Sequence, residues 1–542
     1  MYERYIKSDL QTFLFSVSAR FQLAWNLPQY QAIVNVEDTL HTTTTAAAAN
    51  MPPQPPTTIA QSEIQEPSHS TRILAKRVIR KIDTRILAIM FITYNLNFMD
   101  KTILSSAAVF GLTEDNHLIG KQYSWVSSIF YFGYLVFEYP TTILIQRLPI
   151  GKYLSGVILL WGAIVASTAA CTSFGGLATC RFLLGVAEAT ISPAFVYVTS
   201  IWYTRDEIPA RTGVWFAGNS CGGFLASLLA YGIGQIDYPL HPWQWMFIIF
   251  GVMTSLWSIF VFLLLPDTIN SATFLTEEEK QYAEDRVVSG GTGRVDPINS
   301  RWKIDQVLEC LADPKTYFFA AISVLTQIPN GGTGSFGNLA LKSFGFTSLE
   351  TTLVTLPASV IAMSTILGTG WLASRFKNIT TFLIIAVVIP PVVGSAIIFS
   401  VKTKGVRLLA YYCLQTGPGA IPLSLGLVSS NYKGVTKKMT VTAIIFLTYC
   451  AGNISGPQTF KTSEKAAGYP TAFKAILICY GLVVFVSLGL RFYLNFVNKR
   501  RDREEGEAAA LEAEVAPGKR QLTAHDYEDV TDLCTPGFRY RS

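Results

Sequence analysis

Charged residues are scarce in this chain. Asp, Glu, Lys and Arg make up 15% of its 542 residues, whereas soluble proteins carry roughly 25%. The eight cysteines form no CxxC pair and no Cys/His cluster, which gives no support for a zinc site or a disulfide framework. The sequence also lacks a phosphate-binding glycine loop and a recognisable nucleophile–base arrangement. We therefore expect no catalytic residue, no metal, no cofactor and no enzymatic activity.

Long apolar runs take the place of the missing charge. A helix needs roughly 20 apolar residues to cross a bilayer, and in lipid its backbone polar groups must be paired within the segment. The predicted fold class is therefore an all-α membrane protein with twelve transmembrane helices, and nucleic acid is not an expected partner at a net charge of only +6. The expected spans are 86–109, 122–145, 153–174, 177–202, 213–235, 244–265, 315–340, 349–373, 380–400, 406–430, 440–459 and 471–495.

A polar stretch divides these spans into two groups of six. Six basic residues just before the first span place the amino terminus, and with it the carboxyl terminus, on the cytoplasmic side. Inside the polar stretch, Thr276 stands three residues before Glu279, a capping-box spacing that predicts a short surface helix. The expected regions are a disordered cytoplasmic tail (1–82), a six-helix bundle (83–266), a cytoplasmic loop (267–313), a second six-helix bundle (314–497) and a cytoplasmic tail (498–542).

Four ionisable residues stand out in the predicted spans, where a charge costs at least about 2.5–3.5 kcal/mol. Asp100 and Lys101 lie in the first span, and Arg181 and Glu188 lie on one face of the fourth, about 10 Å apart along the axis. Adjacent residues on a helix point in different directions, so Asp100 and Lys101 should have separate partners. The four are predicted to line one central cavity. The alternative is structural ion pairs between the two spans.

Proline and glycine interrupt three later spans. The strings are IPNGG in the seventh span, QTGPG in the tenth and GNISGPQ in the eleventh. Such breaks expose backbone polar groups at membrane depth, which is tolerated only inside the protein or along a cavity. The polar residues beside the breaks, Asn330, Asn453 and Gln458, are therefore predicted to bind substrate. The alternative is that the breaks are hinges without substrate contact.

The two halves share a local feature. The string TILIQR, which closes the second span, reaches Arg147 just after it, and GWLASR, from Gly370 to Arg375, does the same for the eighth span. An arginine at the inner end of the second helix of each half supports a transporter built from two related bundles. Arg147, Gly370 and Arg375 are predicted to act in gating between conformations.

These strings together resemble the major facilitator superfamily and, more narrowly, its anion:cation symporter family and fungal allantoate permease branch. The resemblance covers residues 83–497 and rests on FMDKTILSSAAVFGL, SIFYFGYLVFEYPTTILIQRLPIGKYL, RFLLGVAEATISP, IPNGG and YCAGNISGPQTF, while the final EDVTDLCTPGFRY is similar to the branch's terminal motif. The resemblance implies twelve helices, alternating access and proton-coupled movement of small organic anions such as allantoate, ureidosuccinate, vitamin acids and some dipeptides.

The resemblance also implies roles for single residues. The family's acidic, proton-coupling pair corresponds to Asp100 and Glu188, and its cationic, substrate-binding pair to Lys101 and Arg181. Lys101 stands where many members have arginine, which keeps the charge and loses bidentate geometry. Residues 218–223 lack the glutamine that binds the substrate in sugar-acid members, so a sugar acid is less expected.

The expected function is proton-coupled uptake of a small carboxylate across the plasma membrane by a monomer. A proton taken up by Asp100 or Glu188 would free Lys101 and Arg181 to bind the anion. The main alternative is an exporter of a secondary metabolite, which the absence of proline from 213–234 disfavours because drug antiporters typically carry a Gly-Pro-rich fifth helix. A nutrient sensor that does not transport is also disfavoured, because both tails look disordered rather than folded.

Overall fold

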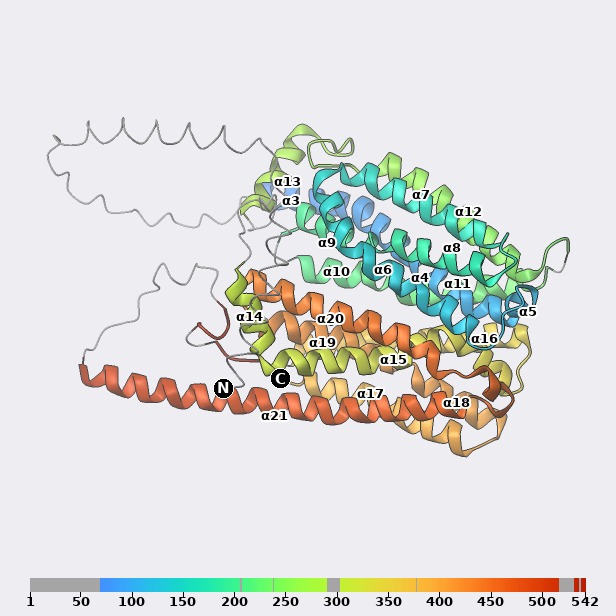
Figure 1. Ribbon diagram of the computed structural model, residues 1–542. Helices are drawn as coiled ribbons and strands as arrows, with labels where there is room; N and C mark the ends of the chain where they lie inside the picture. Colours follow the sequence, from blue (N-terminus) through green and yellow to red (C-terminus); the bar gives the residue numbers. More distant parts are fainter. Residues whose placement is uncertain are drawn as a thin grey trace, which may run out of the picture. The chain divides into compact units, whose positions relative to one another are not determined.

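The described part of the chain is helical throughout. The computed structural model describes residues 69–204, 207–236, 238–289, 303–376, 378–515, 531–535 and 538–542, and these contain no strand. Figure 1 shows the long helices running side by side in two groups that follow the order of the sequence. The predicted all-α fold class is confirmed.

The first group holds the first six predicted spans, and most of its helix boundaries lie within three residues of the predicted ones. Within it α7 packs on α12, α6 on α8 and α4 on α11. The fourth and fifth spans are each divided into two helices. The elements are α4 (Ala88–Val109), α6 (Gln122–Arg147), α7 (Ile150–Thr168), α8 (Phe174–Glu188), α9 (Ile191–Trp202), α10 (Ile208–Phe216), α11 (Gly218–Ile233) and α12 (Pro242–Leu264).

The second group holds the last six predicted spans. Within it α15 packs on α20, and α21 packs on both α15 and α17. The tenth and eleventh spans each contain a short 3-10 turn. The elements are α15 (Pro314–Ser343), α16 (Ser348–Arg375), α17 (Thr380–Ser400), α18 (Lys404–Leu414), η3 (Gly417–Gly419), α19 (Ala420–Asn431), α20 (Val435–Ser455), η4 (Gly456–Thr459) and α21 (Pro470–Val515).

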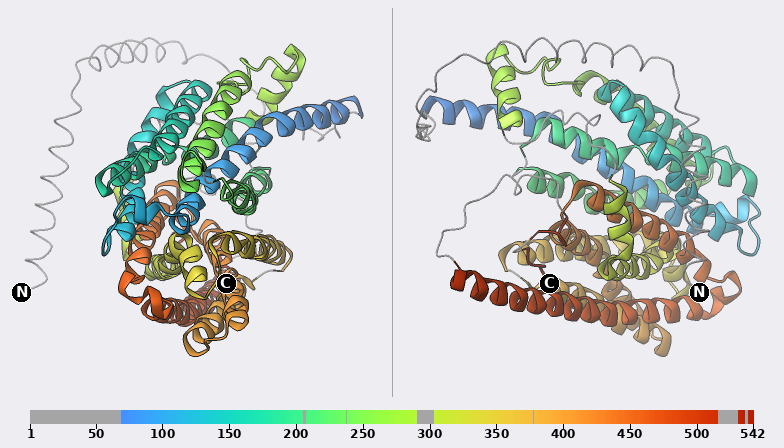
Figure 2. Two further views of the ribbon diagram at one scale, coloured as in Figure 1. Left: turned by 90° about the vertical axis from the view of Figure 1, so that its right-hand side faces the viewer. Right: turned by 60° about the vertical axis from the view of Figure 1, so that its left-hand side comes forward.

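Three helix pairs join the two groups: α4 packs on α15, α11 on α16 and α6 on α20. The two views of Figure 2 show the groups as separate bundles that meet along these helices. The described residues therefore contain helices at all twelve predicted spans, six in each bundle.

Large apolar side chains cover the outside of both bundles. Leu256, Ile259 and Phe260 of α12 are exposed, as are Phe485 and Phe492 of α21. So much apolar surface is expected of helices that face lipid. Eight helices among the described residues are long and apolar enough to cross a membrane. The other four segments (α4, α10 with α11, α15, and α18 with α19) are not among these eight, and they supply most of the cavity wall described below.

The tail predicted to be disordered up to residue 82 is helical over its last part, so that prediction is wrong for 69–82. Helix α3 (His69–Ile82) continues through a short π-helical turn, Asp83–Leu87, into α4. Val78 and Ile82 are fully buried, and Lys81 Nζ lies 2.6 Å from a carboxylate oxygen of Glu279. These apolar contacts order a segment that its basic composition had marked as solvated. Residues 1–68 lie outside the described residues.

The predicted surface helix after Thr276 is confirmed as α13 (Glu277–Ser289). The Thr276 backbone N donates to Glu279 Oε2 over 3.0 Å, and the Glu279 backbone N donates to Thr276 Oγ1 over 3.4 Å, which is the predicted capping box. Helix α14 (Ile304–Ala312) follows in the same polar stretch and was not predicted.

The carboxyl-terminal tail is folded in two places, so its predicted disorder is wrong there. Helix α21 extends to Val515, far beyond the predicted end at 495. The last described residues then return to the second bundle, where Asp532 and Tyr540 are buried. Their partners are buried lysines, which no local pattern in the tail could reveal.

Helices α6 and α8 touch backbone to backbone, because a Cβ on Gly185 would lie 2.0 Å from the Phe130 carbonyl oxygen. We expect Gly185→Val to destabilise the first bundle by roughly 3 kcal/mol or more, since backbone must move apart. Gly175→Val on the same helix is the control, because no atom lies within 4 Å of its Cβ position. Thermal unfolding of the purified protein in detergent measures both. Equal stability of the two variants would contradict this packing.

Candidate functional site

A cavity of about 280 Å³ lies between the two bundles. Its wall comes from α4 and α11 on one side and mainly from α15, α16, α18 and α19 on the other. None of the described residues that line it carries a formal charge. Its polar surface is instead hydroxyl groups and five side-chain amides: Asn219, Gln327, Asn330, Asn338 and Gln415. The size and the polar lining suit a small molecule that exchanges hydrogen bonds with amides.

One face of α4 meets this cavity. Phe98, Thr102 and Ser105 line it, and Lys101 is their neighbour on the helix without lining the cavity itself. Asp100 points the other way, into the first bundle, where the Trp161 indole and the Thr254 hydroxyl are its polar neighbours. The prediction that the two adjacent residues point in different directions is confirmed.

Lys101 and Glu188 form the contact nearest the cavity. Lys101 Nζ lies 3.4 Å from Glu188 Oε2 and donates to Asn97 Oδ1 over 3.0 Å. The Asn97 amide in turn donates to Glu188 Oε2 over 2.8 Å. The Glu188 side chain is fully buried, whereas 28% of the Lys101 side chain is exposed. Lys101 also lies over the Phe130 and Tyr134 rings, at 5.7 and 5.8 Å from their centroids. Lys101 is thus the member of the pair that reaches open space.

Asp100 and Arg181 are buried without full hydrogen bonding. Neither Asp100 oxygen has a hydrogen-bond partner among the described residues, and Nε and Nη2 of Arg181 have none either. The Arg181 guanidinium lies 5.7 Å from the Phe247 ring centroid and interacts electrostatically with Asp100 and Glu188. Buried polar atoms are almost always paired, so unpaired ones leave room for a proton, a water molecule or a ligand.

The structure therefore brings the four charged residues together but does not open all of them to the cavity. Asp100, Arg181 and Glu188 are 1%, 4% and 1% exposed, and the set forms a cluster inside the first bundle beside the cavity wall. The prediction that the four line the cavity is wrong in this conformation, because none of them is among its lining residues and only Lys101 has a partly exposed side chain. The reason is the rotation of α4 and α8, which turns their charged residues toward each other rather than toward the second bundle.

The polar residues of the seventh and eleventh spans form an amide triad. Asn453 Nδ2 donates to Gln327 Oε1 over 2.9 Å, and Asn330 Nδ2 donates to the same oxygen over 3.1 Å. Asn330 lines the cavity, whereas Asn453 is fully buried behind it. Gln327 also lines the cavity and was not among the predicted site residues. Its signal in the sequence was a glutamine in an apolar span, three residues before Asn330.

The predicted helix breaks hold for two spans of three. The tenth and eleventh spans change to 3-10 turns at Gly417 and Gly456. The seventh does not break, because α15 continues as a helix through Pro329. Glycines instead allow α15 to pack closely on the eleventh span. A Cβ on Gly331 of α15 would lie 2.7 Å from the Asn453 Cα atom, and a Cβ on Gly456 of the eleventh span would lie 2.3 Å from the Ile328 carbonyl oxygen.

Polar contacts between the bundles gather at the end opposite α3, among the described residues. Gln458 lies there rather than in the cavity wall, and its Nε2 donates to Ser128 Oγ over 3.2 Å. Tyr123 donates to the Ser335 carbonyl over 2.8 Å, and Lys342 to the Val109 carbonyl over 3.1 Å. The sequence predicts that α3 lies on the cytoplasmic side, and on that prediction the end closed by these contacts is the outer one.

The three residues predicted to act in gating lie at or near the α3 end of their helices. Arg147 ends α6, Arg375 ends α16, and Gly370 lies just over one turn before Arg375. All three are exposed, and Gly370 has no atom within 4 Å of its Cβ position. The two arginines form no ion pair within the described part of the chain. Their role in gating stays a prediction.

Comparison with known proteins agrees with this architecture. A sequence profile of the Major Facilitator Superfamily matches residues 90–457. A protein of Schizosaccharomyces pombe described as an uncharacterized transporter is 36% identical over 470 residues, which cover 86% of this chain and 89% of that protein. The allantoate permease of Saccharomyces cerevisiae is 34% identical over 475 residues, which cover 85% of each chain. Among solved structures, a D-xylose–proton symporter covers 75% of this chain and 96% of its own with a TM-score of 0.58 at 13% identity.

The structural likeness shows the fold, and the sequence relatives show the family. The profile spans well over half of the chain, and both relatives match along most of their own length. The protein is accordingly a multi-pass membrane transporter and not an enzyme. The chain belongs to the major facilitator superfamily, in its fungal allantoate permease-like branch.

Proposed function

We propose that this transporter takes up a small organic anion together with a proton. The observation that carries the proposal is the contact between Lys101 and Glu188 beside a cavity whose described lining carries no formal charge. Lys101 can neutralise either the Glu188 carboxylate or an anion in the cavity. A proton on Glu188 removes one of these two competitors, so proton and anion favour each other's binding.

The charge balance of the cluster of Asp100, Lys101, Arg181 and Glu188 favours a stoichiometry of one proton per monocarboxylate. Asp100 and Glu188 offset Lys101 and Arg181, so the empty cluster is neutral overall. One added proton leaves one positive charge, which a monocarboxylate neutralises. The loaded carrier then moves no net charge in its buried centre, which lowers the cost of changing conformation. When the proton leaves toward the cytoplasm, Lys101 returns to Glu188 and the anion loses its partner.

The cavity wall favours a carboxylate that also carries amide or ureido groups. Five side-chain amides with both donors and acceptors surround the space, and amide and ureido groups match them in both senses. The relative from Saccharomyces cerevisiae that is 34% identical is named an allantoate permease, and allantoate is a carboxylate with ureido groups. Allantoate, ureidosuccinate, an amide-bearing vitamin acid or a dipeptide are the candidates, and we place the transporter in the plasma membrane as a monomer.

Uptake into vesicles with reconstituted protein tests this proposal. The labelled probes are allantoate, ureidosuccinate, pantothenate and a dipeptide, with an acid exterior and a neutral interior. For the monocarboxylate probes, allantoate and pantothenate, one proton per anion predicts an accumulation of about tenfold for each pH unit, because about 1.4 kcal/mol corresponds to a factor of ten. A protonophore should abolish it. Substrate depletion from the vesicle interior under the same gradient would instead indicate an antiporting exporter, and accumulation without a gradient would contradict proton coupling.

A further inference from the structure

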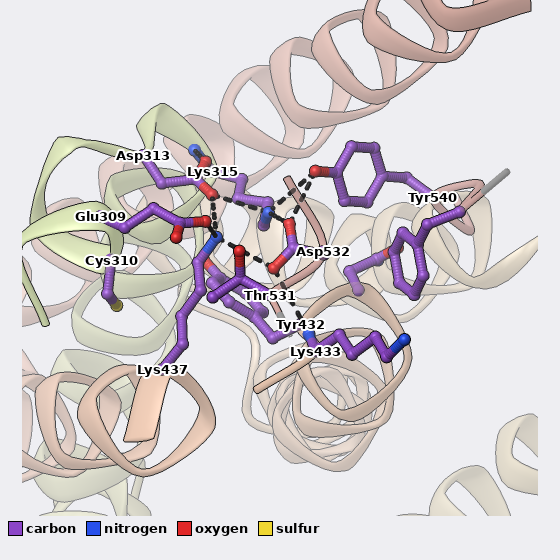
Figure 3. A network of polar contacts seen from close by, with 12 residues as sticks. Glu309, Cys310, Asp313, Lys315, Tyr432, Lys433, Lys437, Thr531, Asp532 and Tyr540 are labelled. Atoms are coloured by element: carbon purple, nitrogen blue, oxygen red, sulfur yellow. Dashed lines mark hydrogen bonds and ion pairs between the residues drawn. The ribbon is translucent and has the colours of Figure 1, made fainter. Parts of the chain in front are cut away.

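The last residues of the chain are bound between helices of the second bundle at its α3 end. Asp532 is fully buried there, together with Lys437 and, at 1% exposure, Lys315 (Figure 3). The Asp532 carboxylate bridges the two lysines: Oδ2 contacts Lys315 Nζ, and Oδ1 lies 2.9 Å from Lys437 Nζ. The Tyr540 hydroxyl donates to Oδ2 over 2.7 Å. A single carboxylate from the tail thus joins α15 to α20.

Asparagine side chains bind the backbone of the same segment. Asn431 of α19 donates to the Arg541 carbonyl over 2.8 Å and accepts from the Arg541 N–H over 2.7 Å. Asn498 of α21 makes the same pair of bonds with Tyr540, at 2.8 and 2.9 Å. Arg501 adds a bond to the Phe538 carbonyl over 2.8 Å. Two reciprocal amide pairs in succession are how a protein holds an extended peptide through its main chain.

The geometry points to a peptide-binding site whose ligand is a later segment of the same chain, described at residues 531–535 and 538–542. In our proposal the site binds the side chains of Asp532 and Tyr540, and its asparagine amides form hydrogen bonds with the neighbouring backbone. Because its contacts come from α15, α19, α20 and α21, the bound segment ties four helices into one unit. The binding of this segment does not depend on the proposed transport function. If the protein transports by alternating access, the four joined helices move as one rigid body, and only this consequence rests on the proposed function.

The charges explain why binding depends on the Asp532 carboxylate. Without the Asp532 carboxylate, Lys315 Nζ would still lie 2.7 Å from Asp313. Lys437 Nζ would still lie 2.8 Å from Glu309 and 3.2 Å from Asp313, so the two lysines would share Asp313. Removing Asp532 takes one charged contact from each of the two buried ammonium groups, and each contact of this kind contributes about 1.5–3 kcal/mol.

The pH dependence follows from the same contacts. Burial alone would raise the pKa of Asp532, but the ammonium groups of Lys315 and Lys437 outweigh it and hold the pKa below its ordinary value. A carboxyl group whose pKa is depressed in the folded state contributes its full stabilisation above the ordinary pKa. That stabilisation is lost only as pH falls through the depressed value. The segment therefore stays bound across the neutral range.

A cut between Val515 and Thr531 tests the site in the full-length protein. A specific protease site is inserted there, the purified protein is cleaved, and retention of the terminal fragment is followed by gel filtration and mass spectrometry. We expect the wild-type fragment to stay bound after cleavage. Asp532→Asn should speed its release by at least about 100-fold. Asp502→Asn is the matched control, because Asp502 also contacts the segment, through Arg539, but is 63% exposed.

Three outcomes overturn the proposal. They are immediate loss of the wild-type fragment on cleavage, equal retention of the fragment by the Asp532→Asn protein, and equal release from the two variants. The wild type needs no substitution to fold, so the first outcome is decisive even if a variant is unstable. A synthetic peptide of residues 531–542, added to cleaved and washed protein, should raise its unfolding temperature by several degrees, and the same peptide with asparagine for Asp532 should not.

Discussion

Changing Glu188 to glutamine is expected to reduce gradient-driven accumulation from about tenfold per pH unit to none, while substrate exchange across the vesicle membrane continues. Glutamine has the size of glutamate, and its carbonyl oxygen can still accept the 2.8 Å hydrogen bond from Asn97. It has no proton to release, however, and it no longer neutralises Lys101. Lys101 would then remain available to the anion in both conformations, so binding persists and coupling is lost.

Two measurements on the same vesicles separate these effects. Counterflow of labelled against unlabelled substrate reports exchange, and accumulation under an acid exterior reports coupling. Glu138→Gln is the matched control, since Glu138 is also a glutamate in a span of the first bundle but lies outside the cluster around Lys101, on α6. We expect the control to accumulate substrate like the wild type. Full accumulation by the Glu188 variant, or equal loss in both variants, would exclude Glu188 as the proton-coupling carboxylate.

The membrane spans could be predicted from the sequence because the signal is local. A run of about 20 apolar residues is long enough to cross a bilayer whatever surrounds it, and the ends of α6, α12 and α17 fall where the pattern places them. The buried charges could be recognised for the same reason. Asp100 and Glu188 stand out in apolar segments, and their cost in lipid does not depend on knowing the fold.

The contacts of the site could not be predicted in the same way, because they depend on how each helix is rotated. A rotation of α4 decides that Lys101 reaches the cavity side while Asp100 meets α7 and α12. Pro329 and its glycines have the composition of a break, yet the close packing of α15 on α20 keeps the helix continuous. Asp532 lies in a polar tail, and its burial depends on Lys315, more than 200 residues away in the sequence.

Removing the charge of Lys101 is expected to weaken substrate binding by about 10- to 100-fold. Among the four clustered charges, Lys101 is the one with a partly exposed side chain, and its helix neighbours Phe98 and Ser105 line the cavity. A hydrogen bond to a charged group contributes about 1.5–3 kcal/mol, which corresponds to a change of this size. Lys101→Gln loses the charge, whereas Lys101→Arg keeps it and adds a planar group that can stack on the Phe130 and Tyr134 rings and bind a carboxylate with two bonds.

Equilibrium binding of a labelled carboxylate to the purified protein at fixed pH measures the effect directly. The arginine variant should bind at least as tightly as the wild type, and the glutamine variant should show the loss. Lys474→Gln is the control, because Lys474 also lies over an aromatic ring, 4.8 Å from the Phe399 centroid, but is exposed on α21 and does not line the cavity. Unchanged affinity of the Lys101→Gln protein would mean that the anion binds elsewhere and not at Lys101. Equal weakening in the arginine and glutamine variants would mean that the shape of the side chain matters and not its charge, and Lys101 would then pack beside the substrate without pairing with it.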